Sequence, residues 1–298
     1  MKNVEKIIEF TGHAGAVYCL TKGRTKTSFF SGAADGFIAE WDLQTLEPLK
    51  FSVKLDSPVF SLCHIVEANL LVAGLFNGHI HVIDLLAKQE IKHFKIPSKG
   101  IYTIYYDKVK NRIYSGGSDG VLNVWDVASF QHMLSLPLCE GKIRQITNGG
   151  NPNEIFVCCG DGKLRVLETE FFNEVNSFMT HEEGINTAFI HLSKVYTGGK
   201  DARIGVFSEN SYQELLNIPA HNYGIYKLME WGNSHFVSCS RDKTIKIWDF
   251  TNLNAPLRLD FKSFKGHTHS VNDLFISEWN NYLISCSDDK KIIVWKEK

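Results

Sequence analysis

Residues 220–250 read AHNYGIYKLMEWGNSHFVSCSRDKTIKIWDF, and this stretch contains the unit from which the whole chain is built. It has an apolar segment at 225–228, a second at 235–240 and a third at 244–248, where polar and apolar residues alternate. Gly, Asn and Asp residues separate the three segments. Short apolar runs at roughly ten-residue spacing with turn residues between them are typical of an antiparallel meander of β-strands.

This unit recurs seven times, at intervals near 42 residues. In each copy an acidic or amide residue stands six positions before a large apolar residue. The pairs are Asp35 with Trp41, Asn77 with Ile83, Asp119 with Trp125, Asp161 with Leu167, Asp201 with Phe207, Asp242 with Trp248 and Asp289 with Trp295. Self-similarity at a fixed period indicates a repeat architecture. Seven copies occupy almost the whole chain, so we expect a single domain over residues 1–298.

The two ends of the chain suggest how the repeats are closed. One sheet of three or four strands cannot bury both of its faces, whereas seven sheets stacked radially can, and a closed ring leaves no exposed end. The last unit stops after its third strand, 291–296, and a β-like stretch at 4–10 precedes the first unit. We therefore expect an all-β fold, a seven-bladed β-propeller of four-stranded antiparallel blades in which the N-terminal strand closes the last blade.

The turns between the second and third strands carry a further signal. In the first four units they contain Asp35-Gly36, Asn77-Gly78, Asp119-Gly120 and Asp161-Gly162. Such dipeptides adopt the positive φ angles that two-residue hairpin loops require. We expect two-residue hairpins at these places.

Bulk properties exclude several classes of protein. The chain has 32 basic and 33 acidic residues and a formal charge of −1, without a long run of either sign, so nothing points to nucleic acid or an anionic membrane. The N-terminus lacks the apolar core of a secretory signal, and polar residues interrupt the most apolar stretch, 59–76. Seven cysteines without CxxC spacing are typical of buried thiols in a reducing compartment, and we expect a cytoplasmic protein.

The motifs themselves match a known family. Gly12-His13 and Gly266-His267 stand before the first strands of their units, and the third strands end in Trp41-Asp42, Trp125-Asp126 and Trp248-Asp249. With these motifs in register, the chain resembles the WD-repeat (WD40) family of seven-bladed β-propellers over essentially its whole length. In three units another residue replaces the tryptophan of this dipeptide, giving Ile83-Asp84, Leu167-Glu168 and Phe207-Ser208.

Three units carry a full set of His, Ser, Asp and Trp at matching positions, here called tetrads. Ser, His and Asp together invite a catalytic-triad interpretation, but an enzyme does not need three active sites around one ring. In a buried relay the indole N–H donates to Ser, Ser to His and His to the carboxylate, which satisfies every polar atom. The resemblance implies the same structural role, so we expect no catalytic residue. The tetrads are His13, Ser31, Asp35 and Trp41; His221, Ser238, Asp242 and Trp248; and His267, Ser285, Asp289 and Trp295.

The expected first strand of each unit begins with two apolar residues three positions apart, as in Val17 and Leu20. An odd separation breaks the two-residue alternation of a flat strand. A bulge between the two would return both to the core and re-aim the residue that follows the first of them. In chain order this residue is Tyr18, Phe60, Tyr102, Arg144, Asn186, Tyr226 and Asn272.

The resemblance implies that these positions line the top of the central channel, where members of the family often contact partners. The residues just before the turn Asp or Asn face the same way in the family, and they include Phe76, Lys200 and Arg241. Aromatic and Arg side chains in a concave mouth are the composition expected of binding hot spots. We expect a partner to contact Tyr18, Phe60, Phe76, Tyr102, Arg144, Lys200, Tyr226 and Arg241. The alternative interpretation is that the aromatic residues only cover the ends of the inner strands.

Two further features bear on metals and catalysis. His79 and His81 lie on one side of a predicted strand as a possible metal pair, but the strand adds no cysteine or carboxylate to them, so we expect no metal and no cofactor. Enzymatic propellers usually gather carboxylates or histidines around the channel. The residues expected there are Cys19, Ser61, Thr103, Gln145, Thr187, Lys227 and Asp273, with a single carboxylate.

Together these patterns predict a non-enzymatic interaction scaffold that binds a protein or peptide at the mouth of the propeller, has no membrane contact and is a monomer outside a complex. A nucleic-acid-associated WD-repeat factor is the alternative, because aromatic and basic side chains can stack single-stranded nucleic acid. The balanced charge argues against that alternative. A propeller enzyme is a third and weaker possibility.

Overall fold

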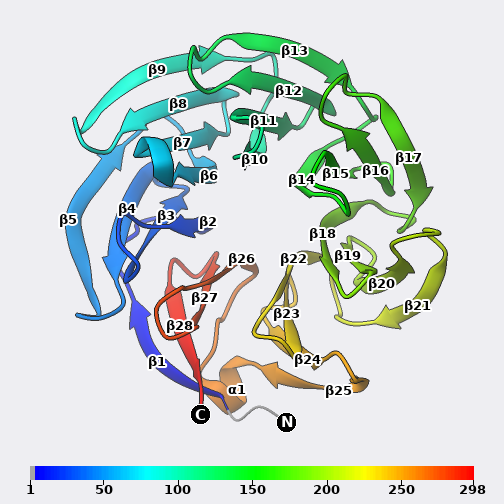
Figure 1. Cartoon of the computed structure of the whole chain (residues 1–298). Helices are drawn as coiled ribbons and strands as arrows, with labels where there is room; N and C mark the ends of the chain where they lie inside the picture. Colours follow the sequence, from blue (N-terminus) through cyan, green and yellow to red (C-terminus); the bar gives the residue numbers. More distant parts are fainter. Residues whose placement is uncertain (1–3) are drawn as a thin grey trace.

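Residues 4–298, which the computed structural model describes, form a ring of seven four-stranded antiparallel sheets (Figure 1). Each sheet is one blade, whose innermost strand faces the central channel and whose outermost strand lies at the rim. The repeat count, the propeller fold and the strand number per blade predicted from the sequence are confirmed.

The first four blades follow the chain without interruption. Blade 1 contains β2 (Val17–Lys22), β3 (Ser28–Ala33), β4 (Phe37–Asp42) and β5 (Glu47–Lys54). Blade 2 contains β6 (Val59–Ile65), β7 (Leu70–Leu75), β8 (His79–Asp84) and β9 (Gln89–Lys95). Blade 3 contains β10 (Ile101–Asp107), β11 (Arg112–Gly117), β12 (Val121–Asp126) and β13 (His132–Pro137). Blade 4 contains β14 (Ile143–Asn148), β15 (Glu154–Cys159), β16 (Lys163–Glu168) and β17 (Glu174–Met179).

The remaining blades include the one that joins the two ends of the chain. Blade 5 contains β18 (Ile185–His191), β19 (Lys194–Gly199), β20 (Arg203–Ser208) and β21 (Glu214–Pro219). Blade 6 contains β22 (Ile225–Glu230), β23 (His235–Ser240), β24 (Ile245–Asp249) and β25 (Asn252–Leu259). Blade 7 contains β26 (Val271–Ile276), β27 (Leu283–Ser287), β28 (Ile292–Glu297) and β1 (Val4–Phe10).

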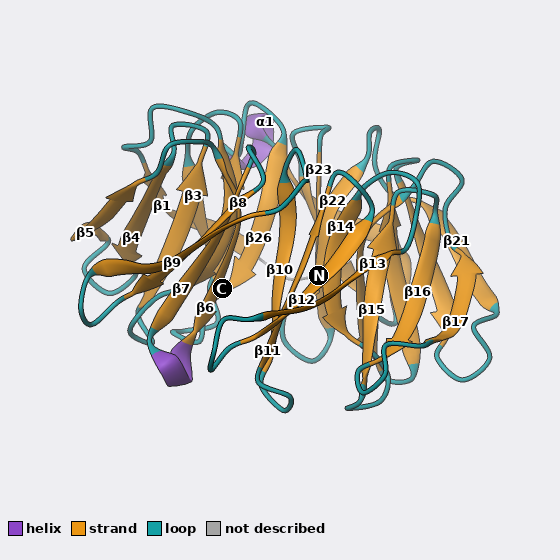
Figure 2. Cartoon of the chain, turned by 90° about the horizontal axis from the view of Figure 1, so that it is seen from above, coloured by secondary structure: helices purple, strands orange, loops and turns teal. Residues whose placement is uncertain are grey.

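Two short helices mark the two faces of the ring. The 3-10 helix Val66–Ala68 connects β6 to β7, and α1 (Phe261–Phe264) lies between blades 6 and 7. They lie on opposite sides of the disc (Figure 2). Because the inner strand β26 starts soon after α1, the beginnings of the inner strands share the face of α1.

Strand β1 closes the ring, as the sequence predicts. It pairs antiparallel with β28, from Val4 opposite Glu297 to Phe10 opposite Ile292. The Phe10 ring lies 5.1 Å from the Trp41 ring of blade 1, so β1 also seals the interface between the last and the first blade.

The apolar core is divided among the seven blade interfaces. The buried apolar side chains of residues 4–298 fall into seven clusters, and each cluster joins two neighbouring blades. Since the hydrophobic contribution to stability scales with the apolar area removed from water, each blade depends on both neighbours for its stability.

Polar side chains on the inner strands tie adjacent blades together. They stand two positions after the first apolar residue of the strand, where the sequence analysis considered a catalytic set. The contacts are Ser61 Oγ to Ile101 O (2.9 Å), Ile146 N to Thr103 Oγ1 (3.2 Å), Ala188 N to Gln145 Oε1 (3.0 Å), Leu228 N to Thr187 Oγ1 (3.0 Å) and Leu20 N to Asp273 Oδ2 (2.9 Å). These residues thus satisfy backbone groups across blade interfaces.

The hairpin turns differ from the expected two-residue form. In blade 1 the loop between β3 and β4 has three residues, 34–36, and the Gly36 N–H donates to the carbonyl of Ala33. Within this loop only Gly36, in last place, has a positive φ, of 75°. Such a three-residue loop with a left-handed last residue is a common form of hairpin. Glycine is not obligatory there, because Ala202, Lys243 and Lys290 take the same conformation in blades 5 to 7.

Candidate functional site

All seven inner strands carry the predicted bulge. In blade 1, Val17 is opposite Ala33 and Cys19 is opposite Gly32, so Tyr18 is left out of the pairing. The same register shift occurs in every other blade. The bulged residues are Tyr18, Phe60, Tyr102, Arg144, Asn186, Tyr226 and Asn272.

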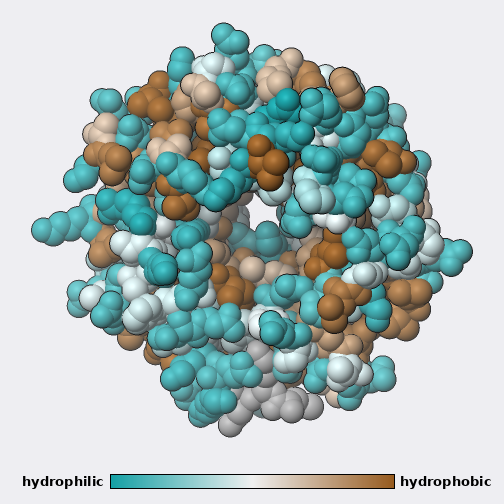
Figure 3. Space-filling model, viewed as in Figure 1, coloured by the Kyte–Doolittle hydropathy of each residue, from teal (hydrophilic) through white to brown (hydrophobic). Residues whose placement is uncertain are grey.

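The bulge turns these seven side chains into one hollow at the top of the channel, which we call the mouth. All seven line a cavity of about 380 Å³. The mouth lies on the face of α1, because each bulge is at the second residue of an inner strand. The channel that it leads to passes through the centre of the ring (Figure 3).

The four aromatic residues of the mouth and Arg144 form a continuous series of contacts, here called the aromatic ladder. Its aromatic members are Tyr18, Phe60, Tyr102 and Tyr226. The ring of Tyr18 meets that of Phe60 edge-on at 4.9 Å, and the rings of Phe60 and Tyr102 stack at 5.5 Å. The Arg144 guanidinium lies 4.9 Å from the centre of Tyr102 and 5.9 Å from that of Tyr226. Phe76 extends the ladder outward, with its ring 5.4 Å from Phe60 and 50% of its surface exposed.

Arg144 is held in the ladder by ring faces. Within residues 4–298 its guanidinium makes neither a hydrogen bond nor an ion pair. Burial lowers the pKa of this guanidinium, and the neighbouring Tyr102 and Tyr226 act in the opposite direction. An arginine stays protonated in proteins, so the mouth presents a positive charge that a ligand can neutralise.

A second hollow continues from the mouth over blades 4 to 6. Its volume is about 670 Å³, and the predicted residues Arg144, Lys200, Tyr226 and Arg241 line it. Sequence reasoning missed two other members of this hollow. They are Lys142, whose Nζ lies 5.1 Å from the Tyr102 ring, and Tyr223, whose ring lies 5.8 Å from the Arg241 guanidinium. Each stands one or two positions before the first apolar residue of its inner strand, a place that only the folded ring brings to the mouth.

The charges around the mouth are unevenly distributed. Lys142, Arg144, Lys200 and Arg241 form what we call the basic sector on blades 4 to 6, although Glu183 and Asp201 also line this hollow. On the opposite side the Asn272 amide donates to Asp288 at 2.8 Å. Burial and the Asp288 charge raise the pKa of Tyr18. The mouth therefore has a basic side and an acidic side.

The predicted tetrad of blade 6 is a hydrogen-bonded chain. His221 Nδ1 lies 2.9 Å from Asp242, and His221 Nε2 lies 2.7 Å from Ser238 Oγ. The Trp248 indole N–H donates to the same Oγ at 2.9 Å. The Ser hydroxyl thus links the indole of the third strand to the imidazole of the preceding loop.

The predicted tetrad of blade 1 has the same connections. His13 Nδ1 lies 3.2 Å from Asp35, and His13 Nε2 lies 2.8 Å from the hydroxyl of Ser31. The indole N–H of Trp41 donates to Ser31 Oγ at 2.7 Å. Because Ser31 has no exposed surface, this hydroxyl is closed to a substrate.

The predicted tetrad of blade 7 repeats the arrangement next to the closing strand. His267 Nδ1 lies 3.0 Å from Asp289, and His267 Nε2 lies 2.9 Å from the hydroxyl of Ser285. The indole N–H of Trp295 donates to Ser285 Oγ at 2.9 Å. Ser285 and Trp295 have no exposed surface, so a ligand at the mouth cannot touch either of them. None of the three tetrads contributes to the mouth, and each links strands within its own blade.

Blade 5 contains a fourth chain that the sequence analysis did not include. His181 Nδ1 lies 3.0 Å from Asp201, and its Nε2 lies 2.9 Å from Thr197 Oγ1. Thr197 replaces the usual Ser, and the Phe207 side chain has no N–H to donate. His181 therefore does not belong to a full set of His, Ser, Asp and Trp in the sequence.

The tetrad carboxylates are strongly stabilised in their charged form. Burial alone would raise the pKa of Asp289, but the His267 hydrogen bond and backbone N–H groups lower it to about 2. Asp242 in blade 6 also has a lowered pKa, because His221, Thr244 and Asn222 outweigh its burial. Burial lowers the pKa of His13 and His221, against the opposing effect of their carboxylates.

The histidine pair of blade 2 has more neighbours than the sequence analysis considered. His79 and His81 of β8 lie beside His93 of β9, and ligand atoms of the three side chains are all within 4.8 Å of one another. Asp56, in the loop before β6, lies within 3.9 Å of His81 Nε2. Both additional residues come from outside β8, so the sequence of that strand alone does not show them.

Comparisons with known proteins agree with this architecture. A family model described as "WD domain, G-beta repeat" matches residues 4–42, 88–126, 212–249 and 260–296, just over half of the chain. Protein tipD of Dictyostelium discoideum is 21% identical over 85% of the chain and 42% of its own length. Nuclear distribution protein PAC1 of Saccharomyces cerevisiae is 29% identical over 47% of the chain and 32% of its own length. Serine-threonine kinase receptor-associated protein of Bos taurus is 24% identical over 80% of the chain and 68% of its own length. The chain thus spans less than half the length of the first two of these relatives.

Neither short helix within residues 4–298 has the length and apolar composition that crossing a bilayer requires.

Proposed function

The chain belongs to the WD40 family, and we propose that it is a non-enzymatic protein-interaction scaffold whose mouth binds an extended peptide or loop of a partner protein. The observation that carries the proposal is the aromatic ladder. It places half-buried rings, and a guanidinium without an ion-pair partner among the described residues 4–298, at the entrance of the channel, where a ligand can remove them from water. Aromatic and Arg side chains of this kind dominate binding energy at protein interfaces.

The ligand that fits has an apolar part and an acidic part. An aromatic or aliphatic side chain can pack on Tyr18, Phe60 and Tyr102, and a carboxylate can approach the basic sector. Charge complementarity of this kind favours the correct partner and orients it. The acidic side at Asp288 would repel the same carboxylate, so the ligand should bind in one direction across the mouth.

We also propose a cellular setting. The seven cysteines are free thiols, which agrees with a reducing compartment, and we place the scaffold in the cytoplasm as a monomer outside any complex. The name of the bovine relative refers to association with a serine-threonine kinase receptor. By analogy we propose a protein partner for this chain.

The test is selection of a displayed peptide library on the wild-type protein, followed by fluorescence anisotropy of the selected peptides. The triple variant with Tyr18, Tyr102 and Tyr226 replaced by Ala should lose binding, and a variant with Lys200→Glu and Arg241→Glu should prefer peptides without acidic residues. Phe171→Ala, at a residue that is 79% exposed and outside both hollows, is the matched control and should bind normally.

Two outcomes would overturn the proposal. One is equal binding of the selected peptides by the wild type and the triple variant. The other is the absence of selected peptides together with binding of a single-stranded oligonucleotide whose affinity falls steeply with salt, because that dependence indicates phosphate contacts.

A further inference from the structure

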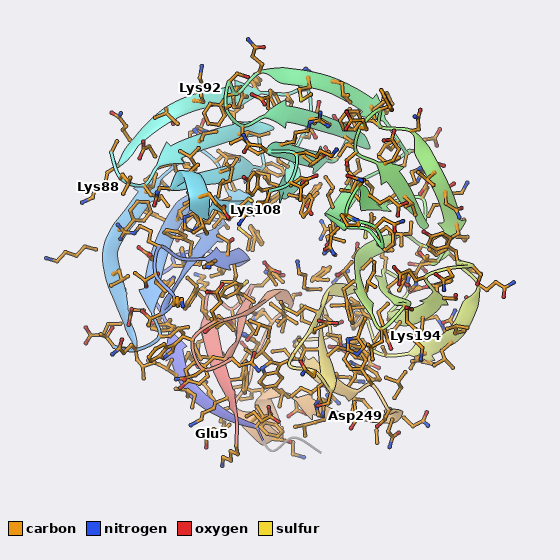
Figure 4. All side chains as sticks on the ribbon, in the orientation of Figure 1. Glu5, Lys88, Lys92, Lys108, Lys194 and Asp249 are labelled. Atoms are coloured by element: carbon orange, nitrogen blue, oxygen red, sulfur yellow. The ribbon has the colours of Figure 1, made fainter. Side chains whose placement is uncertain are left out.

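Three histidines meet on the outer hairpin of blade 2, away from the mouth. His81 of β8 is the direct cross-strand partner of His93 of β9, and His79 stands two residues before His81 on the same side of the strand. Lys88 and Lys92 mark this hairpin at the outer edge of the ring (Figure 4). Directly opposite residues in an antiparallel pair have neighbouring side chains, so the strand register itself brings the imidazoles together.

The three rings are packed closely enough to share one ligand. His93 Nε2 lies 3.0 Å from His79 Nδ1. The rings of His81 and His93 stack at 4.4 Å, and those of His79 and His93 lie 4.7 Å apart. Ligand atoms of a tetrahedral metal are a little over 3 Å apart when metal–nitrogen bonds are about 2.0–2.1 Å long. Side-chain rotations that turn one ring of the stacked pair His81 and His93 would bring the ligand atoms to that spacing.

His81 carries an unsatisfied nitrogen into this cluster. The residue is 6% exposed, and its buried Nε2 has no hydrogen-bond partner among residues 4–298. Its other nitrogen, Nδ1, lies 2.9 Å from Glu90 Oε2. If Nδ1 carries the proton and donates to Glu90, the lone pair of Nε2 is free, which is the state that a metal-binding histidine requires. A buried polar atom without a partner is otherwise unfavourable.

A carboxylate lies over the same cluster. Asp56, in the loop that connects blade 1 to blade 2, places Oδ1 3.9 Å from His81 Nε2 and Oδ2 3.8 Å from His79 Nδ1. Its side chain is 59% exposed and can therefore move by the short distance that coordination needs. Three imidazoles from β8 and β9 and one carboxylate from the loop before blade 2 form a complete tetrahedral set.

We propose that His79, His81, His93 and Asp56 bind one Zn²⁺ ion, with Glu90 as the residue that orients His81. Imidazole and carboxylate ligands in tetrahedral arrangement suit Zn²⁺ better than Mg²⁺ or Ca²⁺, which prefer six or more oxygen ligands. With four protein ligands the site has no open position, so its role is structural.

The position of the site suggests what the ion does. Blade 2 has Ala73 and Ile83 where blades 1, 6 and 7 have the Ser and Trp of the tetrad, so it lacks that link between strands. A bound Zn²⁺ would join β8, β9 and the preceding loop in its place. Binding to the folded state alone stabilises a protein.

The experiment uses the full chain, purified without a histidine tag and stripped of metal with a chelator. Isothermal titration with Zn²⁺ should give one site per chain, and Co²⁺ should give the intense visible absorption of a tetrahedral complex. His93→Asn should abolish the high-affinity site, whereas His269→Asn, at an exposed histidine in the loop before β26, should leave it unchanged. Glu90→Gln should weaken Zn²⁺ binding by about 10–100-fold, the usual effect of losing a group that orients a ligand.

Stability provides an independent readout. Zn²⁺ should raise the thermal midpoint of the wild type and slow hydrogen exchange in β8 and β9, and Mg²⁺ should do neither. His93 is exposed, so its replacement should leave the metal-free fold intact. Loss of Zn²⁺ binding by His93→Asn can then be attributed to the missing ligand. The proposal is overturned if the wild type binds no Zn²⁺, or if His93→Asn binds it as tightly as the wild type does.

Discussion

Removal of residues 1–11 should destabilise the protein severely, because it removes β1 and opens the ring. The strand is the outermost of blade 7, and without it β28 becomes an unprotected sheet edge. Exposed edges of this kind pair with other chains. The variant should therefore unfold at lower temperature and also aggregate.

The magnitude follows from the side chains that β1 buries. Val4 and Phe10 are both 4% exposed, and full burial of such residues contributes about 1.5–3 kcal/mol each. The backbone hydrogen bonds to β28 are offset by the entropy of ordering the strand, which costs about 1–2 kcal/mol per residue. The net loss is thus about 3–6 kcal/mol, a large part of the 5–15 kcal/mol that typically stabilises a folded protein.

A single substitution tests the same reasoning with less disruption. Phe10 packs 5.1 Å from Trp41 and 5.9 Å from Phe29, and Phe10→Ala should cost about 3–5 kcal/mol, the usual effect of emptying a buried aromatic site. Phe171→Ala, at a residue that is 79% exposed, is the matched control and should change stability by less than about 0.5 kcal/mol.

Urea unfolding followed by tryptophan fluorescence measures both variants, and size-exclusion chromatography detects association through the open edge. An unchanged unfolding midpoint for the deletion, or equal effects of Phe10→Ala and Phe171→Ala, would refute the account of closure.

Two further predictions concern the tetrads. Asp242→Ala should reduce the free energy of unfolding by about 2–4 kcal/mol, because it leaves His221 and two backbone N–H groups without their acceptor. The control is Asp119→Ala at the equivalent position of blade 3, which removes a 3.3 Å contact with the Val121 N–H and should cost much less. Equal losses of stability in urea unfolding would contradict the hydrogen-bonded relay. Acid should destabilise the protein in two stages. Because the pKa of His221 is lowered in the folded protein, its contribution to stability is complete above about pH 6.5, the pKa of histidine in the unfolded chain, and is lost as the pH falls. The lowered pKa of Asp289 adds a second loss of stability below about pH 4. Calorimetry between pH 8 and 3 measures this, and a midpoint that rises on acidification would show the sign to be wrong.

The sequence by itself determined the repeat number, the strand pattern and the closure by the N-terminal strand. Each of these depends on a local pattern that recurs seven times, so a departure in one unit, such as Ile83 or Leu167 in place of Trp, does not alter the result. The bulges were also predictable, because the three-residue spacing of Val17 and Leu20 is itself a local departure from strand alternation.

Only the tertiary structure decided which residues meet across units. The contact of Leu20 with Asp273 joins residues 253 positions apart, and the Arg144 cation lies between rings from blades 3 and 6. The cluster of His81, His93 and Asp56 likewise depends on strand register and on a loop from the preceding blade. Periodicity specifies the direction in which a side chain leaves its strand, whereas its neighbours are set by how the curved sheets pack around the ring, and no single repeat contains that information.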